Sequence, residues 1–389
     1  MNWKTLSPYL IGIFSFGIIL MFIPYLLTLP TITGLEFSDS GAIGDTIGGT
    51  TAPFIGFLGV FFTFLAFYIQ YEANEQTRKD IKLERFENKF YEMVRLHREN
   101  VQEIKISGKH SGRKAFVKMY QEFNVIYKVC NAIINKYKIK NISINDQTKL
   151  AYTIFFFGVG EISNRGLNYY LGEFEEKIIS SIIKELQKCQ KKYSSKKNNE
   201  WQKFNLKIGK EKIKFEMDFF PFDGHVSKLG HYFRHIYQTI KLPVVDSGFK
   251  DKNKEVEYSK RYSYVKTLRV QLSNHEQAMI YYNSFFDAGK VWWSDGTIDL
   301  KQNINGTESN LSYFLDYGLI KNLPLNLIEG MGPDPVREFF FKLVEKGYKI
   351  NSEDKHNNLQ KRLADLFEWH IKSDRFSQLV EEKNKLDNK

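Results

Sequence analysis

An uncharged run of 18 residues, Ala52 to Ile69, constrains the fold of this chain more than any other feature. A helix rises about 1.5 Å per residue, so this run covers about 27 Å, close to the hydrocarbon thickness of a bilayer. A second uncharged run, Leu6 to Leu29, precedes it, and a polar segment ending at Asp45 separates the two. The pair predicts a transmembrane hairpin over residues 1–70, with spans at about 6–29 and 48–70.

Two other interpretations of the glycine-rich stretch GAIGDTIGGTTAPFIGFLG fail. A phosphate-binding loop of the GxxxxGK[ST] type needs a basic residue beside its glycines, and none lies between Lys4 and Arg78. A secretory signal peptide would explain the first run only, whose apolar part is too long and which no small-residue cleavage site follows. We therefore expect both spans to be retained.

The charges that flank the spans predict the topology. The loop between them carries Glu36, Asp39 and Asp45 and no base, whereas the basic segment QTRKDIKLER closely follows the second span. Because cytoplasmic flanks are enriched in Lys and Arg, both termini are expected in the cytoplasm.

The positive charge lies almost entirely after the second span. The chain of 389 residues has a net charge of +11, yet residues 1–77 contain one base and five acids, so the remainder carries +15. This excess fits an anionic lipid surface, nucleic acid, or the Lys-, Asn- and Ile-rich composition of an AT-rich genome. Two cysteines, Cys130 and Cys189, are too few for a disulfide scaffold, which favours a reducing cytosol.

The segment after the second span predicts a stalk helix over residues 71–107. It contains neither Gly nor Pro from Tyr71 to Ile104 and places five residues on one helical face at spacings of three and four: Leu83, Phe86, Phe90, Met93 and His97. The stalk is expected to continue from the span. Its apolar seam predicts either coiled-coil pairing or docking onto its own domain.

Residues 108–389 are predicted to form a helical cytoplasmic domain, so the fold class is mainly α. Helical periodicity runs over 113–138, 147–157, 174–192, 228–241, 258–287, 309–315, 335–346 and 356–383. The alternation in NLKIGKEKIKFEMDFF around Gly209 predicts a short β-hairpin. Surface loops are expected at 190–201 and at VVDSGFKDKNKE.

Two pairs of residues have spacings that occur in catalytic or metal sites. His231 and His235 lie one helical turn apart, which suits packing, a metal site with a third ligand from elsewhere, or contact with an anion. Arg269 and His275 have the loose Arg-to-His spacing of the HEPN class of ribonucleases, in which these residues act on the scissile phosphate. Arg234 and His235 are further weak catalytic candidates. No complete catalytic set is visible, so a non-enzyme without cofactor or metal is favoured.

Four segments together resemble the AbiC-like phage abortive infection family of bacteria: GAIGDTIGGTTAPFIGFLG, RFENKFYEMVRLHREN, GHYFRHIYQTIK and LRVQLSNHEQAMIYYNSFF, the last followed by YGLIKNLP. Their order covers most of residues 41–325. The residues that carry the resemblance in the cytoplasmic part are Phe86, Glu87, Asn88, Phe90, Tyr232, Phe233, Arg234, Tyr237, Arg269, Leu272, Ser273, Glu276 and Asn283. His275 stands where the family is expected to accept an aromatic residue, which counts against the ribonuclease interpretation.

The resemblance implies antiphage defence, in which infection arrests or kills the host before phage can mature. It supplies no mechanism. The expected location is the bacterial inner membrane. A cytoplasmic sensor with a membrane-active hairpin is favoured, with a membrane-tethered ribonuclease or nucleic-acid-binding module as the alternative. The expected partners are the lipid bilayer, further copies of the chain, and a phage protein or nucleic acid as the trigger.

The glycines around the start of the second span have a predicted role in helix packing. Gly44 and Gly48, with Gly49 alongside, form a small-residue face that permits close helix approach in lipid. This face is expected to pack the two spans of one chain or, alternatively, to join several hairpins. Pro53 is expected to loosen the helix, and Asp45 to stay hydrated at the outer interface.

Arg234 and Arg269 each lie among aromatic and apolar residues, which predicts partly buried guanidinium groups held by carboxylate or carbonyl partners. Glu276 is the expected partner for one of them. Under this interpretation both arginines stabilise the fold.

Overall fold

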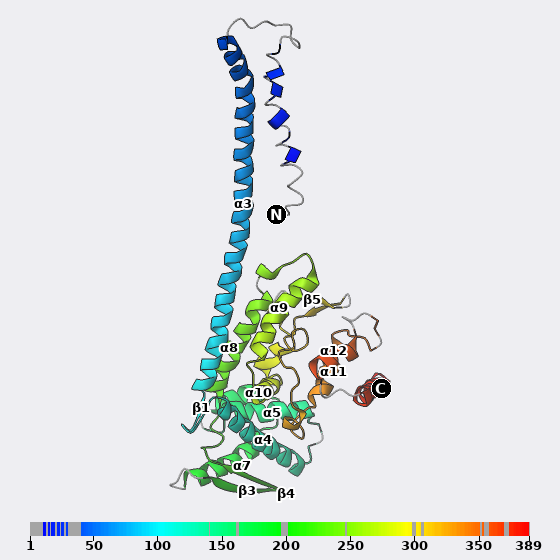
Figure 1. The fold of residues 1–389 in the computed structure, drawn as a ribbon. Coiled ribbons are helices and arrows are strands. Elements are labelled where there is room, and N and C mark those ends of the chain that lie inside the picture. The colour runs from blue at the N-terminus through cyan, green and yellow to red at the C-terminus, as the bar shows by residue number, and fades with distance from the viewer. Residues whose placement is uncertain are drawn as a thin grey trace. The chain divides into compact units, whose positions relative to one another are not determined.

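The computed structural model describes residues 40–139, 141–160, 163–195, 201–245, 247–297, 301–304, 307–350, 352–353, 358–368 and 373–388, with isolated positions before residue 40. The fold is mainly helical, as predicted (Figure 1). The first predicted span, residues 6–29, lies largely outside the described residues. The structure therefore shows one long apolar helix and leaves the two-span hairpin a prediction.

The helices have the following bounds: α3 Ser40–Glu103, α4 Arg113–Lys136, α5 Ile144–Phe157, α6 Asn164–Tyr170, α7 Glu176–Ser194, α8 Val226–Val245, α9 Lys254–Arg269, α10 Asn274–Asn283, α11 Pro335–Glu345, α12 Leu359–Leu366 and α13 Ser373–Asp387. Three antiparallel strand pairs accompany them: β1 Lys105–Ile106 with β2 His110–Ser111, β3 Gln202–Ile208 with β4 Glu211–Met217, and β5 Lys301–Ile304 with β6 Thr307–Asn310. Short 3₁₀ helices lie at Ser247–Phe249, Asp287–Trp292 and Leu325–Leu327.

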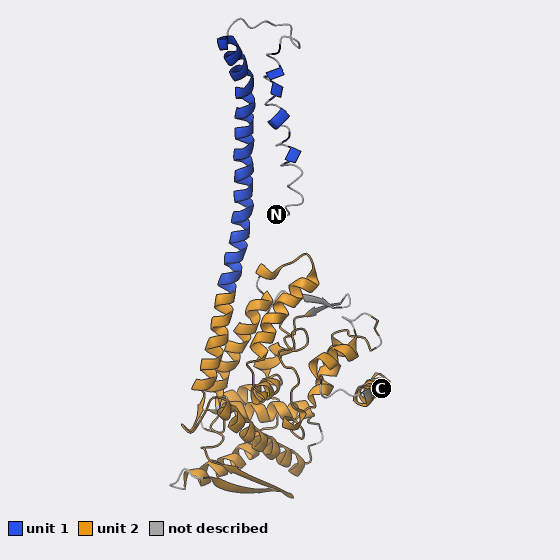
Figure 2. Ribbon diagram, viewed as in Figure 1, with its two compact units in different colours: residues 1–86 blue, residues 87–389 orange. Residues whose placement is uncertain are grey.

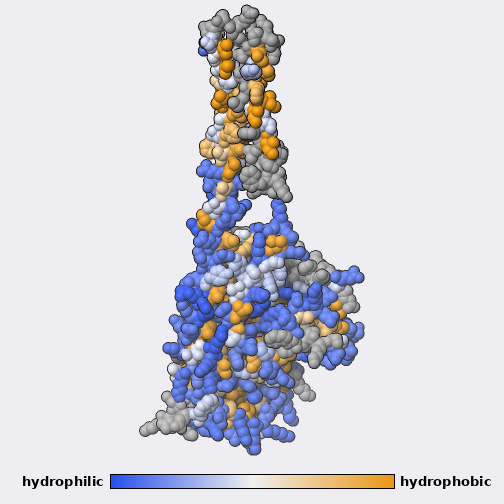
Figure 3. Space-filling view, in the orientation of Figure 1, coloured by the Kyte–Doolittle hydropathy of each residue, from blue (hydrophilic) through white to orange (hydrophobic). Residues whose placement is uncertain are grey.

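Helix α3 is 64 residues long and has no break at Pro53, so the stalk does continue from the apolar segment. It contains an 18-residue window of mean hydropathy 2.0, no part of which is buried, and it is long and apolar enough to cross a membrane. Figure 3 shows hydrophobic residues gathered along this part of the helix. The hydroxyls of Thr50 and Thr63 donate to carbonyls of their own helix, so these polar groups need no outside partner.

The chain divides into two compact units, residues 1–86 and 87–389 (Figure 2). The boundary falls inside α3. The first unit, in its described part, consists of the apolar portion of α3 and the start of the stalk. The second unit contains every other helix and strand named above, together with the C-terminal end of α3.

Helix α4 is the centre of the second unit, because α5, α7 and α10 all pack against it. The fully buried ring of Phe123 on α4 lies 5.6 Å from that of Phe155 on α5 and 4.4 Å from that of Tyr282 on α10. Such offset and tilted aromatic pairs add to the stability that area burial gives. The numerous aromatic residues therefore build the core.

The helix predicted over 258–287 is wrong as a single element, because it is broken between Arg269 and Asn274 into α9 and α10. Ser273 has an extended backbone, and its hydroxyl accepts from the N–H of Glu276 while the Glu276 carboxylate accepts from the N–H of Ser273. This reciprocal capping box starts a new helix in the middle of an apolar pattern.

Two other helix predictions also fail. Over residues 309–315 the chain forms the end of β6, and a turn follows in which the Asp316 carboxylate accepts from the N–H of Ser312. Over 356–383 the structure has two helices, α12 and α13, in place of one. The other predicted helices, 113–138, 147–157, 174–192, 228–241 and 335–346, correspond to α4, α5, α7, α8 and α11.

The predicted β-hairpin is present as β3 and β4. Ile208 pairs with Glu211 across a two-residue connection, and Gly209 has a positive φ of 59°. Glycine adopts this conformation without the steric penalty that a side chain would bring, and the connection suits the twist of the two strands. Helix α7 extends into the predicted loop at 190–201 as far as Ser194, and residues 196–200 lie outside the described part.

Candidate functional site

The stalk end of α3 brings a polar side chain into the second unit. Phe90, Val94, His97 and Val101 are buried and recur at spacings of four and three, so they share one face of the helix. The ring of Phe90 lies 5.2 Å from that of Tyr264 on α9. The predicted seam from Phe90 onward therefore docks onto its own domain, and His97 is the polar residue on it.

Glu276 of α10 is the centre of the buried polar cluster that His97 enters. Its side chain is fully buried, with 0 % exposure. One carboxylate oxygen, Oε2, accepts from the N–H and the hydroxyl of Ser273 at 2.9 and 2.6 Å. The other, Oε1, accepts from the hydroxyl of Tyr232 on α8 at 2.9 Å. A buried carboxylate without these donors would be costly, so the local cap and a distant helix satisfy it together.

His97 faces Glu276 without reaching it. Its Nε2 lies 3.7 Å from Oε1 of Glu276, and neither ring nitrogen has a hydrogen-bond partner among the described residues. Burial, with smaller contributions from the nearby His235 and Arg113, lowers the pKa of His97 to about 4. The imidazole is therefore neutral near pH 7. Buried polar atoms without partners are rare in folded proteins and frequently mark functional positions.

Two more basic residues complete the cluster. The ring of His235 on α8 stacks on that of His97 with centroids 6.2 Å apart, and its Nε2 donates to the carbonyl of Met93 at 2.9 Å. Arg113, at the start of α4, reaches in from the surface, with its Nε 3.9 Å from Oε2 of Glu276 and its side chain 64 % exposed. The cluster thus joins α3, α4, α8 and α10.

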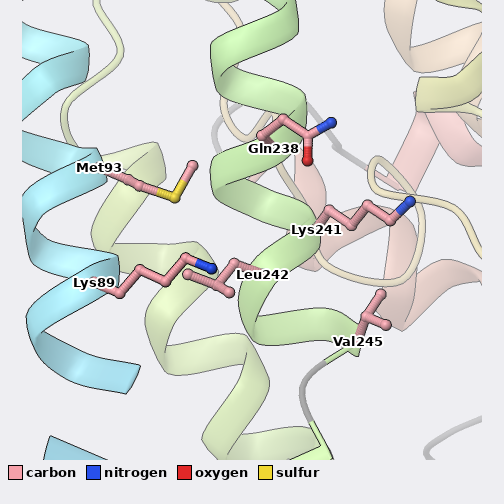
Figure 4. A pocket seen from close by; sticks show the side chains of 6 residues that line it. All are labelled: Lys89, Met93, Gln238, Lys241, Leu242 and Val245. Carbon is pink, nitrogen blue, oxygen red and sulfur yellow. The ribbon is translucent and has the colours of Figure 1, made fainter. Parts of the chain in front are cut away.

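A surface pocket of about 420 Å³ lies between α3 and α8 (Figure 4). Its lining comprises Lys89, Met93, Gln238, Lys241, Leu242 and Val245. Two lysines line the pocket together with three apolar side chains, and the Nζ of Lys241 donates to the hydroxyl of Tyr237 at 3.4 Å. Met93 links it to the cluster, because its carbonyl holds His235.

Arg269 and His275 are not brought together as a phosphate-binding pair. Arg269 is 8 % exposed, and its Nη1 donates to the carbonyl of Gly318 at 2.6 Å while the guanidinium lies 5.6 Å from the ring of Tyr262. His275 packs edge-on against Tyr120. The buried guanidinium is engaged by the main chain, which disfavours the ribonuclease interpretation.

The predicted partnership of Glu276 with Arg234 or Arg269 is wrong, whereas the predicted burial of Arg269 and its carbonyl partner are confirmed. Arg269 is held by a carbonyl, and the contacts of Glu276 are Ser273, Tyr232, His97 and Arg113. Arg234 is exposed, so its predicted partial burial is also wrong. The burial of Arg234 was predicted from its aromatic neighbours in sequence, but adjacent residues on a helix point in different directions.

The remaining family-like residues have structural contacts. The Asn283 amide accepts from the indole N–H of Trp292 at 2.8 Å and donates to the hydroxyl of Tyr152 at 3.1 Å. Glu87 accepts from Tyr264, and Tyr237 donates to Asp295. Phe86, Phe233 and Leu272 are buried, whereas Asn88 and His231 are exposed.

The glycine face has open space beside it. A Cβ built on Gly44, Gly48 or Gly49 meets no atom within 4 Å among the described residues. Asp45 and Pro53 lie in the same first part of α3. The predicted close packing of this face in lipid stays a prediction.

Within the described residues, no group of three or more His, Cys, Asp or Glu side chains is arranged to hold a metal ion. The cluster itself offers a buried carboxylate, a neutral imidazole and a tyrosine whose pKa is raised by burial and by Glu276. A shift of α3 would change the 3.7 Å separation of His97 Nε2 from Glu276 Oε1. The sequence places His97 on the stalk seam, but its approach to Glu276 and that of Arg113 were not predicted. A single histidine on an otherwise apolar seam was the available signal.

Comparison with protein families gives a match within the second unit. Residues 224–296 match the family described as "Putative phage abortive infection protein". This confirms the resemblance over a segment that holds α8, α9 and α10, and with them Tyr232, His235, Ser273 and Glu276. Comparisons with curated proteins and with solved structures gave no match.

Proposed function

We propose that this chain is a membrane-anchored abortive infection protein in which residues 87–389 sense infection and α3 carries the signal to the bilayer. The family match supports the role in phage defence. One observation carries the coupling: α3 runs without interruption from an exposed apolar segment to the buried His97, which faces Glu276 of the matched segment at 3.7 Å.

His97 is suited to transmit a signal because its position is not fixed by hydrogen bonds. Glu276 is held by Ser273 and Tyr232, whereas neither nitrogen of His97 has a partner among the described residues. Movement of α3 against α8 and α10 therefore breaks no hydrogen bond of this ring. A ligand in the neighbouring pocket, which Met93 and Lys89 of α3 line, would bias the same movement.

At the membrane, the proposed output is a loss of membrane integrity through association of several chains along Gly44, Gly48 and Gly49. Small residues let helices approach closely in lipid.

The proposed location is the inner membrane of a bacterium, crossed twice, with both termini in the cytoplasm. Alkaline phosphatase fused after Thr33 should then be active, and the same enzyme fused at Lys389 should be inactive. Activity at Lys389 would refute this topology.

The experiment that tests the function follows membrane potential, RNA integrity and plaque formation in the same infected cells. We expect early depolarisation with intact RNA in cells that carry the parent chain. Gly48→Leu should insert normally, because Leu is favourable in lipid, but should prevent close helix contact and lose defence. Val60→Leu, which exchanges one exposed bulky residue for another in the same segment, is the matched control.

His97→Leu should lose defence at an unchanged protein level, because the imidazole is the proposed coupling group. Tyr91→Leu, at a position 52 % exposed on the same helix, should keep defence. RNA degradation before depolarisation would instead support a nuclease. Full defence by both Gly48→Leu and His97→Leu would refute the coupling and leave α3 a plain anchor.

A further inference from the structure

The β3–β4 hairpin has an apolar inner face and a basic outer face. Phe204, Ile208, Ile213 and Met217 are buried on the inner face. The exposed residues alternate with them along both strands: Lys203, Asn205 and Lys207 on β3, and Lys212, Lys214 and Glu216 on β4. We call the outer positions, together with Lys210 of the turn, the lysine face.

The charges of the lysine face are not balanced by the fold. Lys207 lies directly opposite Lys212 in the strand register, and like charges opposite each other destabilise a strand pair. Lys203 is paired with Glu216 at 3.5 Å. For Lys207, Lys210, Lys212 and Lys214 no carboxylate lies within 4.0 Å in the part of the chain that the structure describes. A hairpin shaped by stability alone would alternate the two signs.

Helix α7 extends the same charge. Its exposed lysines recur at spacings that place them on one helical face: Lys177, Lys184, Lys188, Lys191 and Lys192. Lys192 joins the two elements, because its Nζ donates to the carbonyl of Lys203 at 3.0 Å. The described residues of 176–217 contain ten lysines and four glutamates, a net charge of +6 in a chain whose total is +11.

We propose that the lysine face binds the phosphate backbone of duplex nucleic acid without regard to sequence. Charge complementarity carries the proposal. Side chains on one face of a strand repeat about every 6.6 to 6.8 Å, and two strands lie about 4.8 Å apart, so the unpaired Lys207, Lys212 and Lys214 are near neighbours on this face. A DNA duplex presents about one charge per 1.7 Å of axis, which several of these amines can neutralise together.

The outer positions also define what kind of nucleic acid fits. None of the six exposed strand positions is aromatic. Single strands are bound largely by stacking their bases on aromatic side chains, and the exposed aromatic residue directly before β3, Trp201, already has the Lys118 amino group over its ring at 4.4 Å. A duplex, whose bases are already stacked, loses nothing by binding here.

The composition of the lysine face favours nucleic acid over the membrane. The face offers no exposed apolar side chain at its strand positions to insert among lipids.

The test uses the full chain in nanodiscs of zwitterionic lipid and a fluorescent 30-base-pair duplex of mixed sequence. We expect binding whose logarithm falls linearly with the logarithm of salt concentration. Replacing Lys207, Lys212 and Lys214 by Gln should weaken binding at least about tenfold at 100 mM salt and lower the salt slope by about three. The matched control replaces Lys252, Lys266 and Lys361, which are exposed on other elements, and should leave binding within about twofold.

A second variant separates binding from folding. Lys212→Glu creates an opposite-charge pair with Lys207 across the strands, so the melting temperature should not fall, while duplex binding should weaken. Equal losses in the two triple variants would show a diffuse charge effect and overturn the proposal. The proposal would also be overturned if the chain bound no duplex but its nanodiscs bound empty anionic vesicles, and the triple lysine variant lost that binding. Such a result would assign the lysine face to lipid.

This inference does not depend on the role in defence, because the assay measures binding alone. If the face also positions the sensor on nucleic acid during infection, that further role rests on the proposed function. If the parent chain binds duplex but the triple variant still protects against plaque formation, the binding site stands and only the role in defence is rejected.

Discussion

The two ends of α3 are parts of one helix in two different surroundings. In the apolar segment large side chains are exposed, such as Phe57 at 68 % and Phe64 at 68 %, and the hydroxyls of Thr50 and Thr63 bond to their own helix. At the stalk end Phe90 is fully buried. The difference shows that helical periodicity alone does not tell which side chains are buried by the protein. The medium around each stretch of the helix decides which apolar side chains need to be buried.

The stability of the chain should depend on side-chain packing at the stalk end much more than in the apolar segment. Replacing one phenylalanine in each part by alanine tests this. Phe90→Ala should lower the free energy of unfolding by about 3 to 5 kcal/mol, because it leaves a cavity beside Tyr264. Phe57→Ala should change it by less than about 0.5 kcal/mol. Chemical unfolding of the full chain in detergent, followed by the fluorescence of the buried Trp292, measures both. Equal losses would mean that the two ends of α3 are packed alike.

The pH dependence of stability sharpens the comparison, because His97 on the stalk end titrates in a buried place. Its pKa is about 4 in the folded chain, below the ordinary value of 6.5, so between these values the unfolded chain binds a proton that the folded chain does not. The stability is therefore fully present above about pH 6.5 and is lost as the pH falls towards 4. The loss from this group amounts to about 3 kcal/mol.

His97→Leu should remove that part of the pH dependence and keep the stability at pH 7, since the lost ring nitrogens have no hydrogen-bond partners among the described residues. The residues that surround the ring are the same in both chains: Glu276, His235, Arg113 and Tyr232. Unfolding curves from pH 4 to 7 measure the difference between the two chains. An unchanged pH dependence in the variant would show that His97 does not titrate as described.

The smallest effect is expected for a hydroxyl in the apolar segment. Thr63→Val removes a hydroxyl that donates to the carbonyl of Gly59 at 2.7 Å, and that carbonyl keeps its helical main-chain partner. The change in stability should stay below about 0.5 kcal/mol. The amount of protein in the washed membrane fraction should equal that of the parent. A large drop would mean that Thr63 contacts a partner helix.

Local interactions made much of this fold predictable. Helices α4, α7 and α11 follow from their periodicity, and the hairpin follows from alternation around Gly209. The failures arose where a local signal competed with a longer pattern. Ser273 and Glu276 begin α10 inside a continuous apolar run, and their spacing was visible in the sequence.

The sequence by itself determined that α3 can cross a bilayer, that the chain after it is basic and mainly helical, and that one segment resembles a phage-defence family. Only the tertiary structure decided which side chains meet. Glu276 receives Tyr232, 44 residues away, and faces His97 on another helix, while Arg269 turns to the carbonyl of Gly318. The physical reason is that periodicity fixes the direction of a side chain on its own helix, whereas its partner depends on how separate helices pack, which no local spacing encodes.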